Sequence, residues 1–342
     1  MNFVSDNAYG ATPEILAALS EANSGAVTSY GEDPVTARVG KKLSEIFEHD
    51  LVMHPVVTGT AANALALATL CPPYGTIFCH RESHIAVDEC AAPEFFTHGA
   101  KLAPLEGRGA KIDPATIAAA LPDFQRGVHS TRPSVVSLTQ ATELGTVYKP
   151  DEIRAIADLA HAHGMTLHVD GARFANALVS LGTSPAALSW KAGVDAMSFG
   201  ATKNGALCAE AVIFFDAKLA ADFEYRRKKG GHLLSKMRFL SVQFEAYLNN
   251  DNWLHTARRA NALAQTLGRD IAGIEGIELA WPVEANAVFA YLPDPVVARL
   301  RKAGAQFYDW QPSSGGRTLV RLVLSFATPA ADITRFVEIA RG

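Results

Sequence analysis

The sequence predicts an α/β protein, with a large domain built on a mainly parallel sheet flanked by helices and a smaller C-terminal α+β domain. Two observations support this. Helical and β-branched segments alternate over most of the 342 residues, an order typical of parallel strands joined by helices. The last part, about a hundred residues, mixes strands and helices within the length of one domain. We therefore expect a large domain with an N-terminal arm over residues 1–245 and a small domain over residues 246–342.

The first third of the chain opens with helices and continues with strands. Thr12 is a suitable N-cap for a helix that begins at Pro13, since proline is favoured at the first helical position. Residues 34–49 place their apolar side chains at helical spacing. Next, short strands are expected at residues 53–57 and 76–80, around an Ala/Leu-rich helix at residues 60–71.

The rest of the chain continues the alternation. Gly164 is a stop signal for a helix that begins at Pro150. A long helical region is expected over residues 235–274. Strands are predicted at residues 134–140, 165–171, 195–205, 210–216, 277–283, 287–293 and 318–326, with helices at residues 294–304 and at the C-terminus.

Composition excludes several classes of protein. The 31 Lys and Arg residues against 35 Asp and Glu residues give a net charge of −4 spread along the chain, which argues against a nucleic-acid-binding face. No segment is long and apolar enough to cross a membrane, and the first residues lack a secretory signal, so we expect a soluble, cytoplasmic protein without membrane contact. The four cysteines form no C-x-x-C pair, which indicates reduced, buried thiols and no metal site.

The first candidate site is the turn Thr58-Gly59-Thr60. It follows an apolar strand and begins a helix, so that free backbone N–H groups and the positive end of the helix dipole form a cup for an anion such as phosphate. A simple N-cap is the commoner explanation for such a turn. Neither a P-loop nor a dinucleotide fingerprint is present.

The second candidate is the segment from His168 to Arg173. Gly171 ends the strand and leaves Asp170 at its carboxyl edge, where open α/β sheets bind their ligands. A carboxylate there can hold a cationic partner, and Arg173 can bind a carboxylate or a phosphate. The alternative, which the residues favour equally, is an Asp N-cap with an Arg on the helix surface.

The third candidate is Lys203, in a loop of small and polar residues between two glycines. A lysine in a partly desolvated pocket loses some of its preference for the charged form, which is the condition for Schiff-base chemistry. Most loop lysines are solvated and have no such role.

His84 is the fourth candidate, because a histidine after a short strand can stack on a flat ligand or move a proton. His80, His84 and Asp88 are spaced like metal ligands on one helix face. The extended pattern before His84 and the absence of H-E-x-x-H argue against a metal site.

One ligand needs the first three candidates together. Pyridoxal 5′-phosphate (PLP) has a phosphate, a pyridine nitrogen that must stay protonated and an aldehyde that bonds a lysine. The Thr58–Thr60 cup, Asp170 and Lys203 answer these needs in turn.

The chain resembles the L-threonine aldolase family of fold-type-I PLP enzymes, in the aspartate aminotransferase superfamily, over essentially its full length. The motif HVDGAR, followed about thirty residues later by a lysine, is the most specific part of the resemblance. The other matching stretches are SDNAYGATPE, TSYGEDPVT, TGTAAN, RESHI, ATKNG, KMRF and LVRLVLS.

The resemblance implies a role for each matching residue. Lys203 would bond the cofactor aldehyde, Asp170 would pair with the pyridinium nitrogen, and His84 would lie over the ring. The implied cofactor-binding set is Thr58, Gly59, Thr60, His84, Asp170, Lys203 and, from a neighbouring subunit, Arg238. The implied substrate-binding set is Ser5, Tyr30, Arg173 and Arg321, in a homodimer or homotetramer with shared active sites.

The implied reaction is the retro-aldol cleavage of L-threonine or L-allo-threonine to glycine and acetaldehyde, with phenylserine as a possible bulkier substrate. Glu143 stands where many family members have a second histidine, so His84, Glu143 and an ordered water are all candidates to take the β-hydroxyl proton. Two alternatives remain at this point. One is a PLP-dependent β-eliminating lyase or aminotransferase, and the other is a non-catalytic phosphate- or nucleotide-binding protein.

Overall fold

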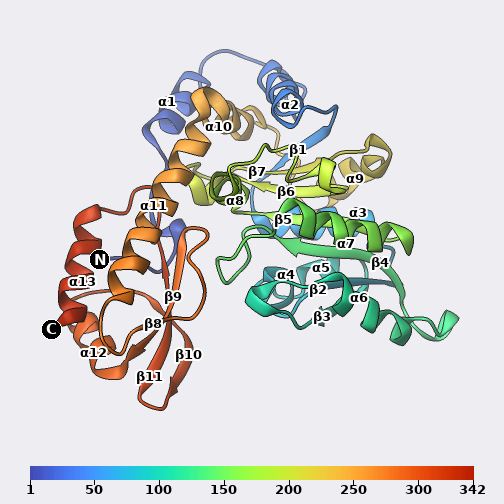
Figure 1. The fold of residues 1–342 in the computed structure, drawn as a ribbon. Helices are drawn as coiled ribbons and strands as arrows, with labels where there is room; N and C mark the ends of the chain where they lie inside the picture. The colour runs from blue at the N-terminus through green and yellow to red at the C-terminus, as the bar shows by residue number, and fades with distance from the viewer.

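The computed structural model describes residues 1–342 as two α/β units, each built on its own sheet (Figure 1). The large sheet has seven strands in the order β1-β7-β6-β5-β4-β2-β3. Only β7 runs against its neighbours, so the prediction of a mainly parallel sheet is confirmed. Its strands are β1 (Val52–Val56), β2 (Gly75–His80), β3 (Lys101–Leu105), β4 (Arg132–Thr139), β5 (Thr166–Gly171), β6 (Ala196–Gly200) and β7 (Glu210–Phe214).

Helices cover both faces of the large sheet, because its central strands bury side chains on both sides. Ala196 and Val212 pack with α3 on one face, whereas their neighbours Met197 and Ile213 face a larger core that includes α7 and α8. The helices of this unit are α1 (Pro13–Glu21), α2 (Pro34–Phe47), α3 (Gly59–Leu70), α4 (His84–Val87), α5 (Ala92–Phe96), α6 (Pro114–Ala120), α7 (Pro150–Ala162), α8 (Phe174–Leu181), α9 (Phe223–Lys229) and α10 (Arg238–Leu248).

The small unit is an antiparallel sheet of four strands in the order β10-β11-β9-β8, packed against helices. Its core also contains Phe3, because the N-terminal segment crosses from the large unit and pairs with the strand residue Val323 and with Gln306. The elements are α11 (Asn252–Ala272), β8 (Glu278–Leu279), β9 (Ala287–Pro293), α12 (Asp294–Lys302), β10 (Tyr308–Ser314), β11 (Arg317–Val323) and α13 (Ala330–Arg341).

The domain division near residue 245 stays a prediction. The two cores meet along α11, whose first turns contribute Trp253 and Ala257 to the large core and whose later turns contribute Leu267 and Ile271 to the small one. A third cluster joins Leu144 of the large unit to residues of the small sheet, so the two units share buried surface.

Several sequence predictions need correction in detail. The region expected to be helical over 235–274 is two helices, since Asn250 and Asp251 adopt left-handed backbone angles between α10 and α11. The strand expected at 277–283 is only two residues long, and Cys90 is exposed, although buried thiols were expected. The predictions missed β3 and β10, which have polar or exposed residues in place of an apolar run.

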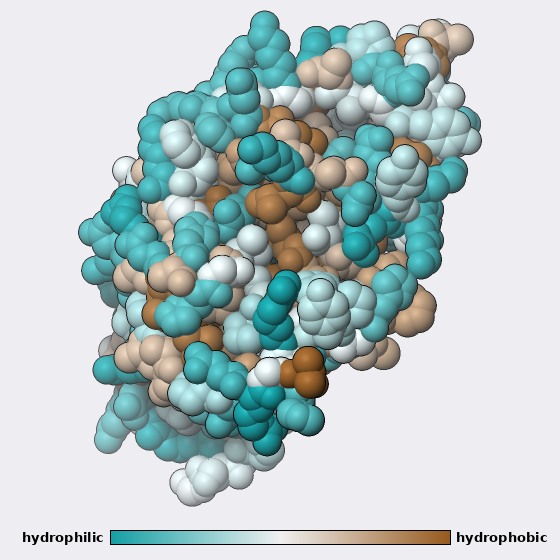
Figure 2. Space-filling view, turned by 90° about the vertical axis from the view of Figure 1, so that its right-hand side faces the viewer, coloured by the Kyte–Doolittle hydropathy of each residue, from teal (hydrophilic) through white to brown (hydrophobic).

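The face of the molecule drawn in Figure 2 is mostly polar, with apolar side chains gathered in a hollow near its centre. None of the helices combines the length and the apolar composition that crossing a membrane requires.

The aromatic cluster behind the Lys203 loop gives a test of the fold. Phe199 is fully buried on β6, and Phe199→Ala should lower the free energy of unfolding by about 3–5 kcal/mol, because a large cavity would open. Urea unfolding of the cofactor-free protein measures this. The control is Phe95→Ala, because Phe95 is 74% exposed, and it should change the free energy of unfolding by less than about 0.5 kcal/mol. Equal losses in the two variants would contradict the burial of Phe199 in the aromatic cluster. The rings around Phe199 belong to Phe47, Phe174, Phe244, Tyr247 and Trp253.

Candidate active site

Asp170 lies buried at the carboxyl end of β5, the edge where ligands of α/β sheets bind. Its Oδ1 accepts a hydrogen bond from the backbone N–H of Ala172 (3.0 Å), and its Oδ2 accepts one from the amide of Asn63 (2.7 Å). Burial alone would raise the pKa of Asp170. The charges of Lys203 and His84, together with these hydrogen bonds, hold that pKa below its ordinary value. Asp170 is therefore an ionised carboxylate within the fold.

Lys203 is in the short 3₁₀ turn Thr202–Asn204 that follows the neighbouring strand β6, where Asp170 pairs in register with Ser198. Asn204 fixes this turn, because its side-chain amide donates to the hydroxyl of Tyr247 (2.9 Å) and to a backbone carbonyl (2.8 Å). Burial, followed by the charge of Arg173, lowers the pKa of Lys203. The side chain of Lys203 is half-buried. Lys203 is therefore a better nucleophile than a fully solvated loop lysine.

The Thr58–Thr60 turn forms the N-terminus of α3, as the sequence predicted. The hydroxyl of Thr58 accepts a hydrogen bond from the N–H of Ala61 (3.2 Å), so it caps α3. No atom lies within 4 Å of the position that a Cβ on Gly59 would occupy, so the space in front of the helix N-terminus is open. A phosphate group fits this cup, and the helix dipole would favour its charge.

His84 begins α4, and its ring is held by a buried carboxylate that sequence reasoning missed. Nδ1 of His84 lies 2.8 Å from Oε1 of Glu89, which also accepts a hydrogen bond from Asn63 (2.8 Å). The hydrogen bond to Glu89 raises the pKa of His84. His80 instead ends β2, so the helix face of metal ligands considered from the sequence does not form.

Glu143 approaches the same histidine from the loop after β4. Its Oε1 accepts a hydrogen bond from the backbone N–H of His84 (2.9 Å), whereas its Oε2 is buried without a hydrogen-bond partner. Burial raises the pKa of Glu143 to about 7. The carboxyl group thus anchors the start of α4 and changes its charge near neutral pH.

Arg173 forms a buried ion pair with Asp6 of the N-terminal segment. Its Nε and Nη2 donate to the two carboxylate oxygens at 2.8 and 2.9 Å, and Asn286 of the small unit donates to the same carboxylate (3.0 Å). Ser5 precedes Asp6 and caps the adjacent turn. Two of the five N–H donors of Arg173 are therefore engaged with Asp6, and both N–H groups of Nη1 have no partner within the protein.

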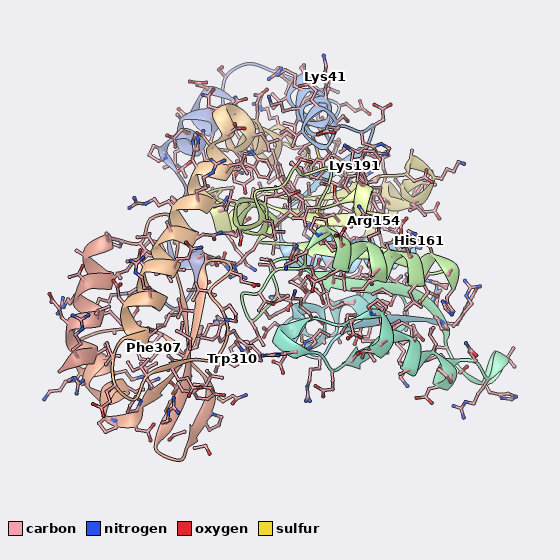
Figure 3. The ribbon with its side chains drawn as sticks, viewed as in Figure 1. Lys41, Arg154, His161, Lys191, Phe307 and Trp310 are labelled. Carbon is pink, nitrogen blue, oxygen red and sulfur yellow. The ribbon has the colours of Figure 1, made fainter.

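Arg321 extends from β11 of the small sheet and has no carboxylate partner. Its guanidinium group lies 5.2 Å from the ring centroids of both Tyr308 and Trp310, and its Nε is buried without a hydrogen-bond partner. Burial, followed by the positive charge of Arg173, lowers the pKa of Arg321, and the negative charge of Asp6 opposes this change. In Figure 3, Trp310 lies at the edge of the small unit on the side of the large one. Arg321 is thus a partly buried cation without a carboxylate partner within the chain.

The remaining predicted residues, Tyr30 and Arg238, lie apart from this cluster. Arg238 donates to the backbone carbonyl of Gly25 (3.0 Å), and Tyr30 is 47% exposed with Lys228 over its ring. No hydrogen bond connects either of them to Asp170 or Lys203 of the same chain, and their predicted roles stay predictions.

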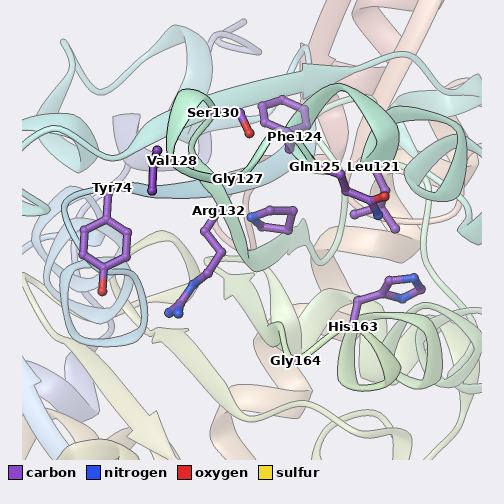
Figure 4. Close-up of a pocket in the computed structure, with 11 residues that line it drawn as sticks. Tyr74, Leu121, Phe124, Gln125, Gly127, Val128, Ser130, Arg132, His163 and Gly164 are labelled. Atoms are coloured by element: carbon purple, nitrogen blue, oxygen red, sulfur yellow. The ribbon is translucent and has the colours of Figure 1, made fainter.

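A large cavity of about 810 Å³ lies elsewhere, at the amino ends of β2 and β4 (Figure 4). It is lined by Tyr74, Phe124, Arg132 and His163 among others, and contains none of the predicted site residues. The candidate active site therefore follows from the polar cluster at the opposite edge of the sheet.

Four contributors to the site were not predicted: Asp6, Asn63, Glu89 and Asn286. Asn63 is the one buried polar side chain of an otherwise apolar helix, and this mismatch was the available signal. Asp6 stands beside Ser5 in the SDNAYG stretch. Glu89 stands only five residues after His84, but its other partner, Asn63, is 26 residues away, and Asn286 and its partner Asp6 are 280 residues apart.

These residues fit PLP: an open anion cup, an ionised buried carboxylate and a desolvated lysine lie at one sheet edge. Fold and site together define a PLP-dependent enzyme of fold type I. The model of the β-eliminating lyase family matches residues 2–295, and the chain belongs to that family.

The relatives agree. A low-specificity L-threonine aldolase of Pseudomonas aeruginosa is 46% identical over 339 residues, which cover 99% of this chain and 96% of the relative. Another from Pseudomonas sp. is 46% identical over 315 residues, covering 92% of this chain and 91% of its own. The solved structure of Leishmania major threonine aldolase superposes with a TM-score of 0.94 at 29% identity, covering 99% of this chain and 98% of that one.

The Asp6–Arg173 pair gives a test of the site's electrostatics. Asp6→Asn should cost up to about 3–5 kcal/mol of unfolding free energy at neutral pH, because it leaves the partly buried guanidinium charge of Arg173 unpaired. Burial would raise the pKa of Asp6, but Arg173 holds it below the ordinary value of 3.8. The stabilisation is therefore complete above that value and is lost as the pH falls through the lowered pKa.

Urea unfolding at neutral and acidic pH measures the difference between wild type and Asp6→Asn. Glu245→Gln removes an exposed pair with Arg38 and should cost no more than about 1 kcal/mol. An equal loss for both variants, or a difference that grows on acidification, would contradict the buried ion pair.

Proposed function

We propose that this chain cleaves L-threonine and L-allo-threonine to glycine and acetaldehyde by a retro-aldol reaction, and that it also accepts bulkier β-hydroxy amino acids such as phenylserine. The observation that carries the proposal is the 46% identity, along 99% of the chain, to a low-specificity L-threonine aldolase. The cluster of Asp170, Lys203 and Arg321 supports it, because it supplies the groups that such a reaction needs.

When bound, PLP supplies an aldehyde carbon that bonds amines and a pyridine ring that takes up the electron pair of a bond broken at Cα. Asp170 would pair with the ring nitrogen and favour its protonated form, because its own pKa is held low and it remains a carboxylate. Lys203 would supply the amine for the aldehyde, since its lowered pKa increases the uncharged fraction. Thr58, Gly59 and Thr60 would hold the phosphate at the N-terminus of α3.

The substrate carboxylate is bound from the junction between the two units. Arg321 presents an unpartnered buried Nε, and Arg173 has Nη1 free beside its pair with Asp6. A carboxylate held at two points fixes the rotation about the N–Cα bond, which selects the bond at Cα that breaks. His84 and Glu143 lie at the same edge, where the β-hydroxyl proton leaves.

β-Elimination is the second candidate reaction, because the family model is that of the β-eliminating lyases. Such an enzyme, like an aminotransferase, uses the same cofactor and lysine but forms a keto acid. The products of threonine turnover therefore separate these candidates.

We also propose a homodimer or homotetramer in the cytoplasm. The exposure of Tyr30, and the position of Arg238 away from the site of its own chain, support active sites shared between subunits. The four cysteines form no disulfide, which supports a reducing compartment.

The first test of function is the product analysis. The PLP-loaded protein should release acetaldehyde and glycine in equal amounts from L-threonine without keto acid. Lys203→Ala should abolish turnover, because the amine that bonds the cofactor is gone, while Lys191→Ala, at an exposed lysine paired with Glu48, should keep it. Keto acid without aldehyde would favour the eliminating reaction, and wild-type turnover in Lys203→Ala would contradict the mechanism.

The second test concerns the substrate carboxylate. Arg321→Ala should lower kcat/KM for L-threonine by about 30-fold or more, mainly through KM, because a partly buried charge pair is lost. Steady-state kinetics measures this. Arg317→Ala is the matched control, since Arg317 is on the same strand but pairs with Glu278 at the surface. Equal effects of both substitutions would remove Arg321 from the substrate site.

A further inference from the structure

Glu89 is a buried carboxylate whose partners all belong to the candidate active site. Its side chain is fully buried, and its Oε2 has no hydrogen-bond partner. Oε1 accepts from the amide of Asn63 (2.8 Å) and contacts Nδ1 of His84 (2.8 Å). The Glu89 carboxylate accepts no hydrogen bond from a backbone N–H group and forms no other ion pair. A buried charge is costly unless it is paired, and here the pairing is with a predicted catalytic residue.

Asn63 connects this carboxylate to a second one. Its Nδ2 donates both to Glu89 and to Oδ2 of Asp170 (2.7 Å). Because both neighbours are acceptors, the amide must turn its NH₂ group toward them, which leaves Asn63 Oδ1 without a partner. The chain thus runs from His84 through Glu89 and Asn63 to Asp170.

We propose that Glu89 is a positioning residue for the reaction proposed above: it holds the ring of His84 through Nδ1, so that Nε2 is the nitrogen that takes the β-hydroxyl proton. Since a carboxylate can only accept, Nδ1 carries a hydrogen and the free lone pair of a neutral ring is on Nε2. No hydrogen bond of the protein engages Nε2, and the His84 side chain is 37% exposed. Glu89 also stabilises the imidazolium that forms, as carboxylates do behind general-base histidines.

Glu143 is the weaker candidate for this step. One of its oxygens already accepts the N–H of His84, and the other is buried. The negative charge of Asp170 adds to the rise of the Glu143 pKa, and the charge of Glu143 in turn raises the pKa of Arg173. Glu143 positions the start of α4.

The step balances in atoms and electrons. The O–H bond of the β-hydroxyl group breaks, its proton joins Nε2 of His84, and its electron pair becomes the second C–O bond of the aldehyde. The electron pair of the Cα–Cβ bond stays with the amino-acid fragment, where a proton at Cα completes glycine. His84 then releases its proton to solvent.

The charges around His84 fix the direction of its titration. The hydrogen bond to Glu89 raises its pKa, burial opposes this, the charge of Asp170 adds to the rise, and the charge of Lys203 opposes it. Glu143 faces only its backbone N–H. Burial raises the pKa of Glu89, while its bonds to His84 and Asn63 oppose that rise. Removing the Glu89 charge should therefore lower the pKa of His84.

The experiment follows the ring of His84 by NMR in the cofactor-free protein from about pH 5 to about pH 9, with His84→Asn to assign the signal. In the wild type the ring should titrate above 6.5, and in Glu89→Gln its pKa should fall. In the PLP-loaded enzyme, kcat/KM rises with pH as the base loses its proton. Glu89→Gln should shift this rise of kcat/KM to lower pH and reduce the maximal kcat/KM at least about 10-fold. Glu89→Asp should restore part of the lost kcat/KM.

The control is Asp88→Asn, which removes the same charge from the exposed neighbouring residue and should move the His84 titration far less. A wild-type ring that titrates below 6.5, or a Glu89→Gln variant with unchanged titration and pH profile, would overturn the proposal. The wild-type titration needs no Glu89 variant, so it decides even if Glu89→Gln does not fold. Failure of the proposed function appears separately, as wild-type protein that releases no acetaldehyde.

Discussion

The site depends on one electrostatic constraint: a carboxylate at the end of β5 must stay ionised while a lysine after β6 gives up part of its charge. Burial raises the pKa of Asp170 and lowers that of Lys203, so on its own it would neutralise both groups. The charges of Lys203 and His84, followed by the hydrogen bonds from Ala172 and Asn63, keep the carboxylate of Asp170 charged. The positive charge of Arg173 lowers the pKa of Lys203 further and so favours its neutral amine. Each group is thereby held in the state that PLP chemistry requires.

The two units of the fold meet at this constraint. The N-terminal segment enters the core of the small unit through Phe3 and places Asp6 against Arg173. The small unit adds Asn286 to the same ion pair and presents Arg321 from its sheet.

The sequence predicted the fold class and the residues with strong local signals, and it failed where partners are distant. Asp170 stands at the end of β5 and Lys203 follows the end of the neighbouring strand β6, so their place at one edge of the sheet follows from topology. The strands β3 and β10 were missed, because exposed and polar residues conceal their period. Glu89 was missed for another reason: its importance comes from contacts with Asn63 and His84 that no local pattern encodes. The sequence predicted that Arg173 can bind a carboxylate or a phosphate, and within the chain its partner is the carboxylate of Asp6.

The most direct test of the account is borohydride reduction of the PLP-loaded protein followed by peptide mass mapping. The account predicts that the cofactor is found on the peptide that contains Lys203 and on no other lysine, because only this amine lies half-buried beside an ionised Asp170. Cofactor on a different lysine, or none retained on the chain, would contradict it.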